Sequence, residues 1–359
     1  MPKFHQLKVK DIRKETKEAV SVAFEVPKDL KEDYQFIQGQ YLTIKKEFNG
    51  EEIRRSYSVC VSPLENELRV AIKKVYKGRF STFANDQLEI GDVLDVMTPM
   101  GRFHTKVEEG QQKNYVCFAG GSGITPIISI IKTVLQIESQ SRVILFYANK
   151  GVDSIIFLEQ LEALKNQYLN RLTLHHVFSG EKLESELFNG YITPQKTRDF
   201  AKLLFNTNEI DDYFVCGPEP MMLAIREGLE SLKVASKKIH IELFAPLGKK
   251  VEHVAKEEGI NFDPTTTSKA TIRLDGDSFE MLLDYGGESI LDAALNAGAD
   301  LPFACKGGVC ATCRAKLVEG EVKMDVNYGL EQEEVDAGFI LTCQSHPRTE
   351  KIVVDFDIK

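Results

Sequence analysis

Apolar and polar positions alternate in short runs over residues 1–107. Each run has the two-residue period of a half-buried strand, and Gly, Pro, Asn or Asp separates it from the next run. The predicted strands are residues 19–26, 41–45, 56–60, 68–73 and 93–96. Many short strands joined by turns are typical of an antiparallel β-barrel, so we predict one over residues 1–107.

The pattern changes over residues 113–245, where continuous apolar strands alternate with helical periodicity. The predicted strands are residues 115–119, 143–148, 172–178, 213–216 and 239–244. The predicted helices are residues 126–137, 154–165 and 218–232. Alternating strands and helices indicate a doubly wound α/β domain with a parallel sheet. Ligands in such sheets bind at the carboxyl ends of the strands.

Residues 246–268 break this order and are rich in charge, Pro and Thr, so we predict a linker there. Two strands (270–274 and 278–283) follow, and Ser289 can cap a helix near 289–297. Further strands at 314–318 and 352–356 complete a small α+β (β-grasp) module over residues 269–359. The chain is therefore multidomain.

Composition and charge narrow the class of protein. Hydrophobic residues make up 43% of the chain and charged residues 28%, as in soluble globular proteins. The first residues form no apolar run, so we expect no signal peptide and a cytoplasmic protein. Residues 115–137 are apolar, but several Gly, Pro126 and Lys132 interrupt them, which favours a buried strand and helix over a membrane span.

The net charge of −9 is concentrated at the C-terminal end. Residues 269–359 contain nine Lys and Arg against 17 Asp and Glu, a net of −8. Such a surface can serve solubility or steer the module toward a basic partner, and both interpretations stay open. Nucleic acid is excluded as the expected ligand, because its phosphates would be repelled.

The strongest chemical pattern is a set of four cysteines. Cys305, Cys310 and Cys313 follow the spacing C-x4-C-x2-C, and Cys343 comes after a gap of 29 residues. This spacing is the plant-type [2Fe–2S] pattern, in which four thiolates ligate two irons. Gly307 and Gly308 suit such a loop, because they let backbone N–H groups approach the sulfurs closely.

Two other interpretations of these cysteines are weaker. Disulfides do not suit a chain without a signal peptide, since a reducing compartment is then expected. A zinc site could use Cys310, Cys313, Cys343 and His346. That arrangement leaves Cys305 without a role and does not explain the paired glycines.

Two patterns in the predicted barrel suit a flavin nucleotide. On one strand, the Arg55 guanidinium can bind a phosphate, the Tyr57 ring can stack on a flat ring, and Ser58 can hydrogen-bond a ring nitrogen. The second pattern begins a short helix, where an anion can bind, and comprises Gly78, Ser81 and Thr82. Each is weak alone, because Tyr57 could equally be a core residue.

Two patterns in the predicted α/β domain follow strands. The sequence GGSGITP, which includes Gly120, Gly121, Gly123 and Thr125, lets a pyrophosphate approach the backbone at a helix N-terminus. The sequence CGPEPM begins with Cys216, Gly217 and Pro218 and places the cysteine at a strand end. Cys216 could also be a small buried apolar residue, which is the interpretation we adopt for Cys60 and Cys117.

The ordered set R-x-Y-S, G-x-x-S-T, GGSGITP and CGPEPM resembles the ferredoxin–NADP⁺ reductase superfamily over residues 1–245. The C-terminal module resembles plant-type [2Fe–2S] ferredoxins. The fused order is that of electron-transfer components of multicomponent oxygenases. The stretches 289–295, 300–314, 319–322, 341–344 and 353–357 resemble one subgroup, the reductase subunits of phenylacetyl-CoA epoxidases.

The resemblance implies roles for individual residues. Arg55 would bind the FAD pyrophosphate together with Gly78, Ser81 and Thr82, Tyr57 would stack on the flavin, and Ser58 would hydrogen-bond near its N5 atom. The residues implied in nicotinamide nucleotide binding are Gly120, Gly121, Gly123, Thr125, Gly217 and Pro218. Cys216 would lie beside the nicotinamide and, with Ser58, belong to the catalytic centre. Phe244 would cover the other flavin face, and Cys305, Cys310, Cys313 and Cys343 would bind the cluster.

The resemblance also implies an activity. Electrons would pass from NADPH or NADH through FAD and the [2Fe–2S] cluster to a di-iron oxygenase of a multicomponent system, as in phenylacetate catabolism. Lys150 at a strand end would meet a 2′-phosphate and favours NADPH, although Gly180 stands where NADP-using relatives often have Arg. The alternatives are a reductase of another aromatic or alkane oxygenase and, in another class, a redox-sensing or zinc-binding scaffold.

Overall fold

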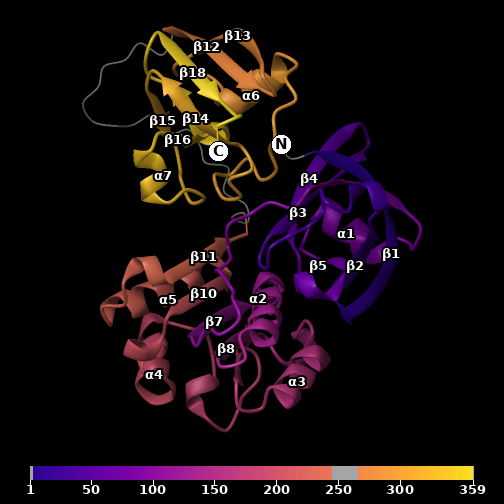
Figure 1. The fold of residues 1–359 in the computed structure, drawn as a ribbon, viewed down its shortest axis with the longest axis vertical. Helices are drawn as coiled ribbons and strands as arrows, with labels where there is room; N and C mark the ends of the chain where they lie inside the picture. The colour runs from indigo at the N-terminus through magenta and orange to yellow at the C-terminus, as the bar shows by residue number, and fades with distance from the viewer. Residues whose placement is uncertain (1–2, 245–265, 359) are drawn as a thin grey trace. The chain divides into compact units, whose positions relative to one another are not determined.

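The structure, a computed structural model, describes residues 3–244 and 266–358 (Figure 1). The chain divides into two compact units, with the boundary after Phe244, and each unit is described by itself. Most of the predicted linker 246–268 lies outside the described residues. Its last two residues, Thr267 and Ser268, belong to a strand of the second unit.

The first part of the larger unit is a six-stranded antiparallel barrel. Its strands are β1 (Phe4–Thr16), β2 (Ala19–Glu25), β3 (Tyr41–Phe48), β4 (Glu51–Ser58), β5 (Leu68–Lys73) and β6 (Val93–Met97). The order is β4-β3-β6-β1-β2-β5, and a bridge between Val59 and Val70 joins the two ends. One helix, α1 (Arg79–Asp86), follows β5. The predicted antiparallel barrel is confirmed, with β1 as a strand that the apolar pattern did not reveal.

The second part of this unit is a five-stranded parallel sheet with the order β11-β10-β7-β8-β9. Its strands are β7 (Asn114–Gly120), β8 (Arg142–Asn149), β9 (Leu172–Phe178), β10 (Asp212–Gly217) and β11 (Ile239–Leu243). The strand order reverses between β7 and β10. The carboxyl ends of these two strands therefore form the crevice where ligands of doubly wound sheets bind.

Helices cover both faces of the sheet, which confirms the doubly wound fold. They are α2 (Ile124–Ile137), α3 (Leu158–Gln167), α4 (Pro194–Leu204) and α5 (Glu219–Ser231). One hydrophobic core contains residues of α2 and α3, and a separate one contains residues of α4 and α5. Helix α3 begins four residues later than predicted, because Phe157 takes a left-handed conformation (φ 64°) just before it.

Helix α2 joins the sheet to the barrel through polar contacts. Ser129 donates a hydrogen bond to the Val61 carbonyl at 2.6 Å, and Thr133 donates one to Ser62 at 3.0 Å. Lys132 forms an ion pair of 3.1 Å with Glu65. These bonds are largely buried, so the barrel and the α/β domain form one packed body.

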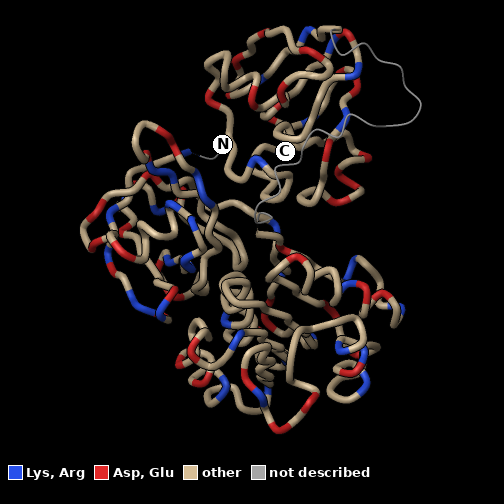
Figure 2. The backbone as a smooth tube through the Cα atoms, turned by 180° about the vertical axis from the view of Figure 1, so that it is seen from behind, with Lys and Arg blue, Asp and Glu red and all other residues tan. Residues whose placement is uncertain are grey.

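The smaller unit is a mixed five-stranded sheet with the order β13-β12-β18-β14-β16. Its strands are β12 (Thr267–Leu274), β13 (Asp277–Asp284), β14 (Arg314–Glu319), β16 (Phe339–Leu341) and β18 (Lys351–Asp355). A second pair, β15 (Val322–Met324) and β17 (Ser345–Pro347), lies beside it, with helices α6 (Ile290–Asn296) and α7 (Gln332–Asp336). Ser289 caps α6 as predicted, accepting the Asp292 N–H at 3.1 Å. Figure 2 marks the acidic residues along this α+β unit.

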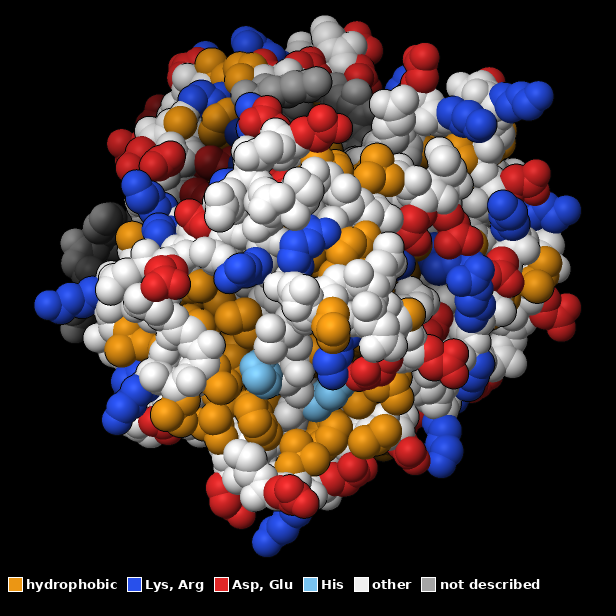
Figure 3. All heavy atoms as spheres, turned by 60° about the horizontal axis from the view of Figure 1, so that its bottom comes forward, with side chains coloured by type: hydrophobic (Ala, Val, Ile, Leu, Met, Phe, Trp, Pro, Cys, Tyr) orange, Lys and Arg blue, Asp and Glu red, His pale blue; other side chains and the backbone are white. Residues whose placement is uncertain are grey.

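Figure 3 views the end of the α/β domain, where hydrophobic side chains and histidines gather among charged residues. The edge strand β9 contributes His175, whose ring stacks on Phe146 and Phe188 with centroids 5.1 and 5.2 Å away. Burial lowers the pKa of His175, so the stack favours a neutral ring. No helix within residues 3–244 or 266–358 is long and apolar enough to cross a membrane.

Candidate functional site

Strand β4 displays the three residues predicted to bind the flavin. Arg55 is exposed, Tyr57 is half-buried with its ring 5.7 Å from that of Phe80, and Ser58 is only 2% exposed. The Ser58 hydroxyl has no hydrogen-bond partner among the described residues. A buried hydroxyl without a partner is costly, so its presence fits a site that a bound ring nitrogen completes. Burial also raises the pKa of Tyr57, which keeps its phenol neutral.

The turn before α1 has the geometry expected for a phosphate site. The Ser81 hydroxyl accepts the Val75 N–H and donates to the Gly78 carbonyl, both at 3.2 Å. A Cβ on Gly78 would lie 2.4 Å from that hydroxyl, so any other residue at 78 would displace the Ser81 side chain. Ser81 therefore shapes the turn, while the first N–H groups of α1 and the Thr82 side chain remain for an anion.

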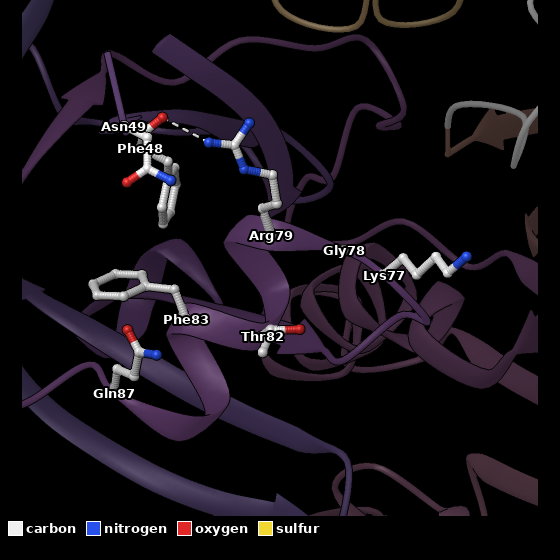
Figure 4. A pocket seen from close by; sticks show the side chains of 8 residues that line it. All are labelled: Phe48, Asn49, Lys77, Gly78, Arg79, Thr82, Phe83 and Gln87. Carbon is white, nitrogen blue, oxygen red and sulfur yellow. Dashed lines mark hydrogen bonds between the residues drawn. The ribbon is translucent and has the colours of Figure 1, made fainter. Parts of the chain in front are cut away.

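A pocket of about 310 Å³ opens beside this turn (Figure 4). Its lining residues are Phe48, Asn49, Lys77, Gly78, Arg79, Thr82, Phe83 and Gln87. The Arg79 guanidinium reaches the β3–β4 hairpin, where it donates to Glu51 at 2.5 Å and to the Phe48 carbonyl at 2.6 Å. Aromatic walls, amides and a nearby helix N-terminus suit a flat ring carrying phosphate. Only Gly78 and Thr82 of this pocket were predicted.

The two predicted nucleotide-binding turns meet at the ends of β7 and β10. A Cβ on Gly123 would lie 2.1 Å from the Cys216 carbonyl oxygen, and one on Gly120 would lie 2.7 Å from Pro218. A Cβ on Gly217 would lie 3.0 Å from the Gly120 backbone. Glycine is therefore required at these positions, because the two backbones are in contact. Without side chains on these turns, a pyrophosphate can approach the backbone in the crevice. Thr125 donates to the Ser122 carbonyl at 3.0 Å within the first turn.

Lys73 is a residue of this crevice that sequence reasoning missed. It ends barrel strand β5, and its ammonium lies 3.4 Å from the position of a Cβ on Gly121, which has φ 52°. Burial lowers the pKa of Lys73, and the nearby charge of Lys150 lowers it further. Lys73 thus brings a cation to the first turn, and the Lys150 charge is near enough to act on it. Nothing in a barrel strand indicated that Lys73 would approach the other domain.

The turn after β8 also receives a carboxylate. The Glu181 carboxylate, from the loop after β9, accepts the Val152 N–H at 3.1 Å. Gly180 donates its N–H to the Lys150 carbonyl at 2.8 Å, so the two loops pack together. The sequence showed no acidic residue at the end of β8, and the fold brings one there from the next strand.

Cys216 lies at the end of β10 and is fully buried in the core that includes α2. Burial raises the pKa of its thiol well above the usual value, so the group is a neutral thiol. This environment agrees with the alternative of a small apolar residue, and the catalytic role of Cys216 stays a prediction. Phe244 packs partly buried against the same core.

Glu242 is a second residue that sequence reasoning missed. It pairs with Cys216 in the register of β10 and β11. Burial raises the pKa of its carboxyl to about 8, although the residue as a whole is partly exposed. The indication was an acidic residue within the apolar strand Ile239–Leu243. A carboxyl with this pKa can hold a proton at neutral pH.

In the smaller unit, the four cysteines form two pairs. The neighbouring Cys310 side chain and backbone N–H groups lower the pKa of Cys305 to about 5, and Cys313 is the partner that lowers the pKa of Cys343. Cys305 accepts the N–H groups of Gly307 at 3.3 Å and of Cys310 at 3.4 Å. Thr312 donates its hydroxyl to the Cys310 sulfur at 3.1 Å. Two cysteine pairs with N–H and O–H donors, each pair containing one cysteine of lowered pKa, fit a centre with two irons.

The zinc alternative does not fit this arrangement. His346, the predicted fourth zinc ligand, instead lies with its Nε2 atom 3.1 Å from the Asp325 carboxylate.

Three family models match the chain in order. Residues 6–105 match the oxidoreductase FAD-binding domain, residues 118–227 the oxidoreductase NAD-binding domain, and residues 272–348 the 2Fe-2S iron-sulfur cluster binding domain. FAD, a nicotinamide nucleotide and a [2Fe–2S] cluster are therefore its cofactors, and the zinc-binding scaffold is wrong. The domain boundaries predicted above enclose these matches, but the exact boundaries stay predictions.

Curated relatives match the whole chain. It is 43% identical over 359 residues to a component of the 1,2-phenylacetyl-CoA epoxidase of Escherichia coli (strain K12), covering 100% of this chain and 99% of that protein. It is 34% identical over 363 residues to the ferredoxin reductase component of a 3-ketosteroid-9-alpha-monooxygenase of Mycobacterium tuberculosis (strain CDC 1551 / Oshkosh), covering 98% and 96%.

Among solved structures, phthalate dioxygenase reductase has the same modular fold. It aligns with a TM-score of 0.59 and 22% identity, covering 98% of both chains. An intact type IV self-sufficient cytochrome P450 monooxygenase aligns with a TM-score of 0.71 and 19% identity, covering 98% of this chain and 41% of its own. The three-domain order is thus shared with proteins of low sequence identity.

Proposed function

Since the chain belongs to the family of FAD-, NAD- and [2Fe–2S]-containing reductase components of multicomponent oxygenases, we propose that it delivers electrons from NADPH to a di-iron oxygenase of the phenylacetyl-CoA epoxidase type. The observation that carries the choice of partner is the full-length similarity to the epoxidase component, which includes all three domains. The 3-ketosteroid monooxygenase component is the less similar relative, so a steroid oxygenase is the weaker choice.

The chain's own residues orient the reactants in this proposal. Arg55 and the α1 turn would bind the FAD pyrophosphate, and the neighbouring pocket would take its adenosine end. Ser58 would donate its unpaired hydroxyl to the flavin ring, while Tyr57 and Phe244 would cover the ring faces. The turns at Gly121 and Gly217 would bind the nicotinamide nucleotide across the crevice.

When bound, FAD supplies a two-electron acceptor for hydride, and the cluster supplies a one-electron carrier. No side chain has to act as a nucleophile. Glu242 would hold a proton beside Cys216 at the crevice, where its raised pKa keeps it protonated at neutral pH. The cysteine pairs would bind the cluster in the smaller unit.

We propose NADPH over NADH because the Lys73 ammonium lies at the first nucleotide-binding turn and the charge of Lys150 acts on it. Either can attract the 2′-phosphate that distinguishes the two nucleotides. The Glu181 carboxylate opposes this preference, but the Val152 N–H offsets part of its charge. A cytoplasmic location also remains a proposal, supported by the thiolate ligands that a cluster needs.

The experiment is a reconstituted assay with the purified protein, NADPH, an oxygenase component of the epoxidase type and phenylacetyl-CoA. We expect NADPH-dependent oxidation of phenylacetyl-CoA. We expect no product when a ring-hydroxylating oxygenase replaces the epoxidase-type oxygenase. Cys310→Ser is expected to abolish product formation while NADPH-dependent ferricyanide reduction continues, because the flavin and cysteine sites lie in separate units. Loss of ferricyanide reduction with FAD still bound would contradict the linear route, and equal activity with both oxygenases would contradict the partner.

A further inference from the structure

Gln344 follows the fourth cysteine and is almost fully buried, at 8% exposure. Its amide nitrogen donates to the Lys306 carbonyl at 3.1 Å and to the Cys343 carbonyl at 2.8 Å. The same nitrogen lies 3.6 Å from the Cys343 sulfur, so the N–H that meets the Cys343 carbonyl is shared with that sulfur as a bifurcated hydrogen bond. One side chain therefore contacts both the loop that carries Cys305 and the distant cysteine.

The backbone of the cysteine loop leaves room for this side chain. Gly308 has φ 74°, and a Cβ there would lie 3.1 Å from the Gln344 Cγ atom and 3.0 Å from Val326. A larger residue at 308 would press against the glutamine and disturb its contacts. Gly308 and Gln344 thus form one packed arrangement, which the cysteine spacing alone did not reveal.

An amide donor at a sulfur has a defined electrostatic consequence. Uptake of one electron adds one negative charge to the cysteine-bound centre, and N–H groups directed at the sulfurs stabilise that charge. Since Gln344 is shielded from water, its dipole is not replaced by solvent. The side chain therefore stabilises the reduced state more than the oxidised state.

We propose that Gln344 is a positioning residue that binds the Cys305 loop to Cys343 and raises the reduction potential of the cluster. This inference rests on the proposed function, because it requires a [2Fe–2S] centre at the four cysteines. Its effect is on the potential at which the centre accepts an electron, and it adds no chemical step.

The test compares Gln344→Met with Ser345→Ala in the full-length, cluster-loaded protein. Methionine has a similar length without an N–H donor. Ser345 is also fully buried and donates to the Leu341 carbonyl at 2.8 Å, so its removal costs a buried hydrogen bond that touches no sulfur. The readout is a redox titration of the cluster followed by electron paramagnetic resonance, with the FAD titrated separately.

We expect Gln344→Met to lower the ratio of reduced to oxidised cluster about tenfold at the wild-type midpoint potential. This change corresponds to a midpoint potential about 59 mV lower, because the couple transfers one electron. Ser345→Ala and the FAD should keep wild-type potentials. A wild-type cluster potential in Gln344→Met would overturn the inference. If Gln344→Met cannot retain a cluster after reconstitution, retention by Ser345→Ala supports the positioning role, and failure of both variants contradicts it. A wild-type protein that takes up no cluster would instead contradict the proposed function.

Discussion

At the scale of single residues, the site contains polar groups that are buried away from water without the partners that would stabilise them. Ser58 has a buried hydroxyl without a partner among the described residues, and Glu242 has a carboxyl whose pKa burial raises to about 8. Both conditions are costly in a protein without its ligands. Such groups are retained where a ligand or a proton completes them.

Ser58→Ala tests this cost directly. We expect the apoprotein to become more stable by about 1 kcal/mol, because an unsatisfied buried hydroxyl is removed. The FAD-loaded variant should reduce ferricyanide with NADPH at a rate at least tenfold lower, since the flavin ring loses a hydrogen bond. Urea unfolding of apoprotein and stopped-flow kinetics measure the two effects. Thr43→Ala, a buried hydroxyl on β3 that is already paired with Ser56, is the control that should destabilise the apoprotein.

Glu242 predicts a pH dependence of stability. The folded carboxyl titrates near 8, whereas the ordinary value is 4.5, so between these values the folded state binds the extra proton. Stability from this group is therefore full below about pH 4.5 and is lost as the pH rises through about 8. Glu242→Gln should flatten the loss of unfolding free energy between about pH 4.5 and pH 8, as measured by urea titrations. An unchanged slope would show that the carboxyl ionises normally.

At the scale of elements, the contact between the β7 and β10 turns leaves no room for side chains. Gly123→Ala places a Cβ 2.1 Å from the Cys216 carbonyl oxygen and must separate the turns. Overpacking of this kind costs about 1–3 kcal/mol. We expect at least a tenfold higher dissociation constant for NADP⁺ with normal FAD content, measured by calorimetry. Ser122→Ala alters the same turn without a new Cβ and should bind NADP⁺ nearly as the wild type does.

Most of these elements could be predicted from the sequence, because apolar periodicity reports burial. Strands β5 and β9 begin and end where the pattern placed them. Strand β1 was missed because its exposed positions carry mostly Lys and Arg, and one of its two partners, β6, is distant in sequence. Motifs located the glycine turns and cysteines, since these need special backbone geometry. Lys73 and Gln344 were not predictable, because their importance comes from contacts that only the tertiary structure creates.

At the scale of the whole molecule, charge is divided unevenly along the chain. The net charge of residues 269–359 is −8, against −1 for the remainder. If this surface steers a basic partner, oxygenase reduction should slow several-fold between 50 mM and 300 mM NaCl, because screening shortens the range of attraction. Reduction of the protein's own cluster by NADPH is the internal control and should change little. A salt-independent rate with the oxygenase would assign the acidic residues to solubility.

The polar contacts of α2 determine how substitutions in this helix affect hydride transfer, the first redox step. This helix starts at the nucleotide turn, and its middle is bonded to the barrel through Ser129 and Thr133. Helix α2 therefore fixes the position of the nucleotide-binding turn relative to the barrel, and with it the position of the hydride donor relative to the hydride acceptor. A substitution in the middle of α2, for example at Ser129, should therefore slow hydride transfer although the residue contacts neither reactant.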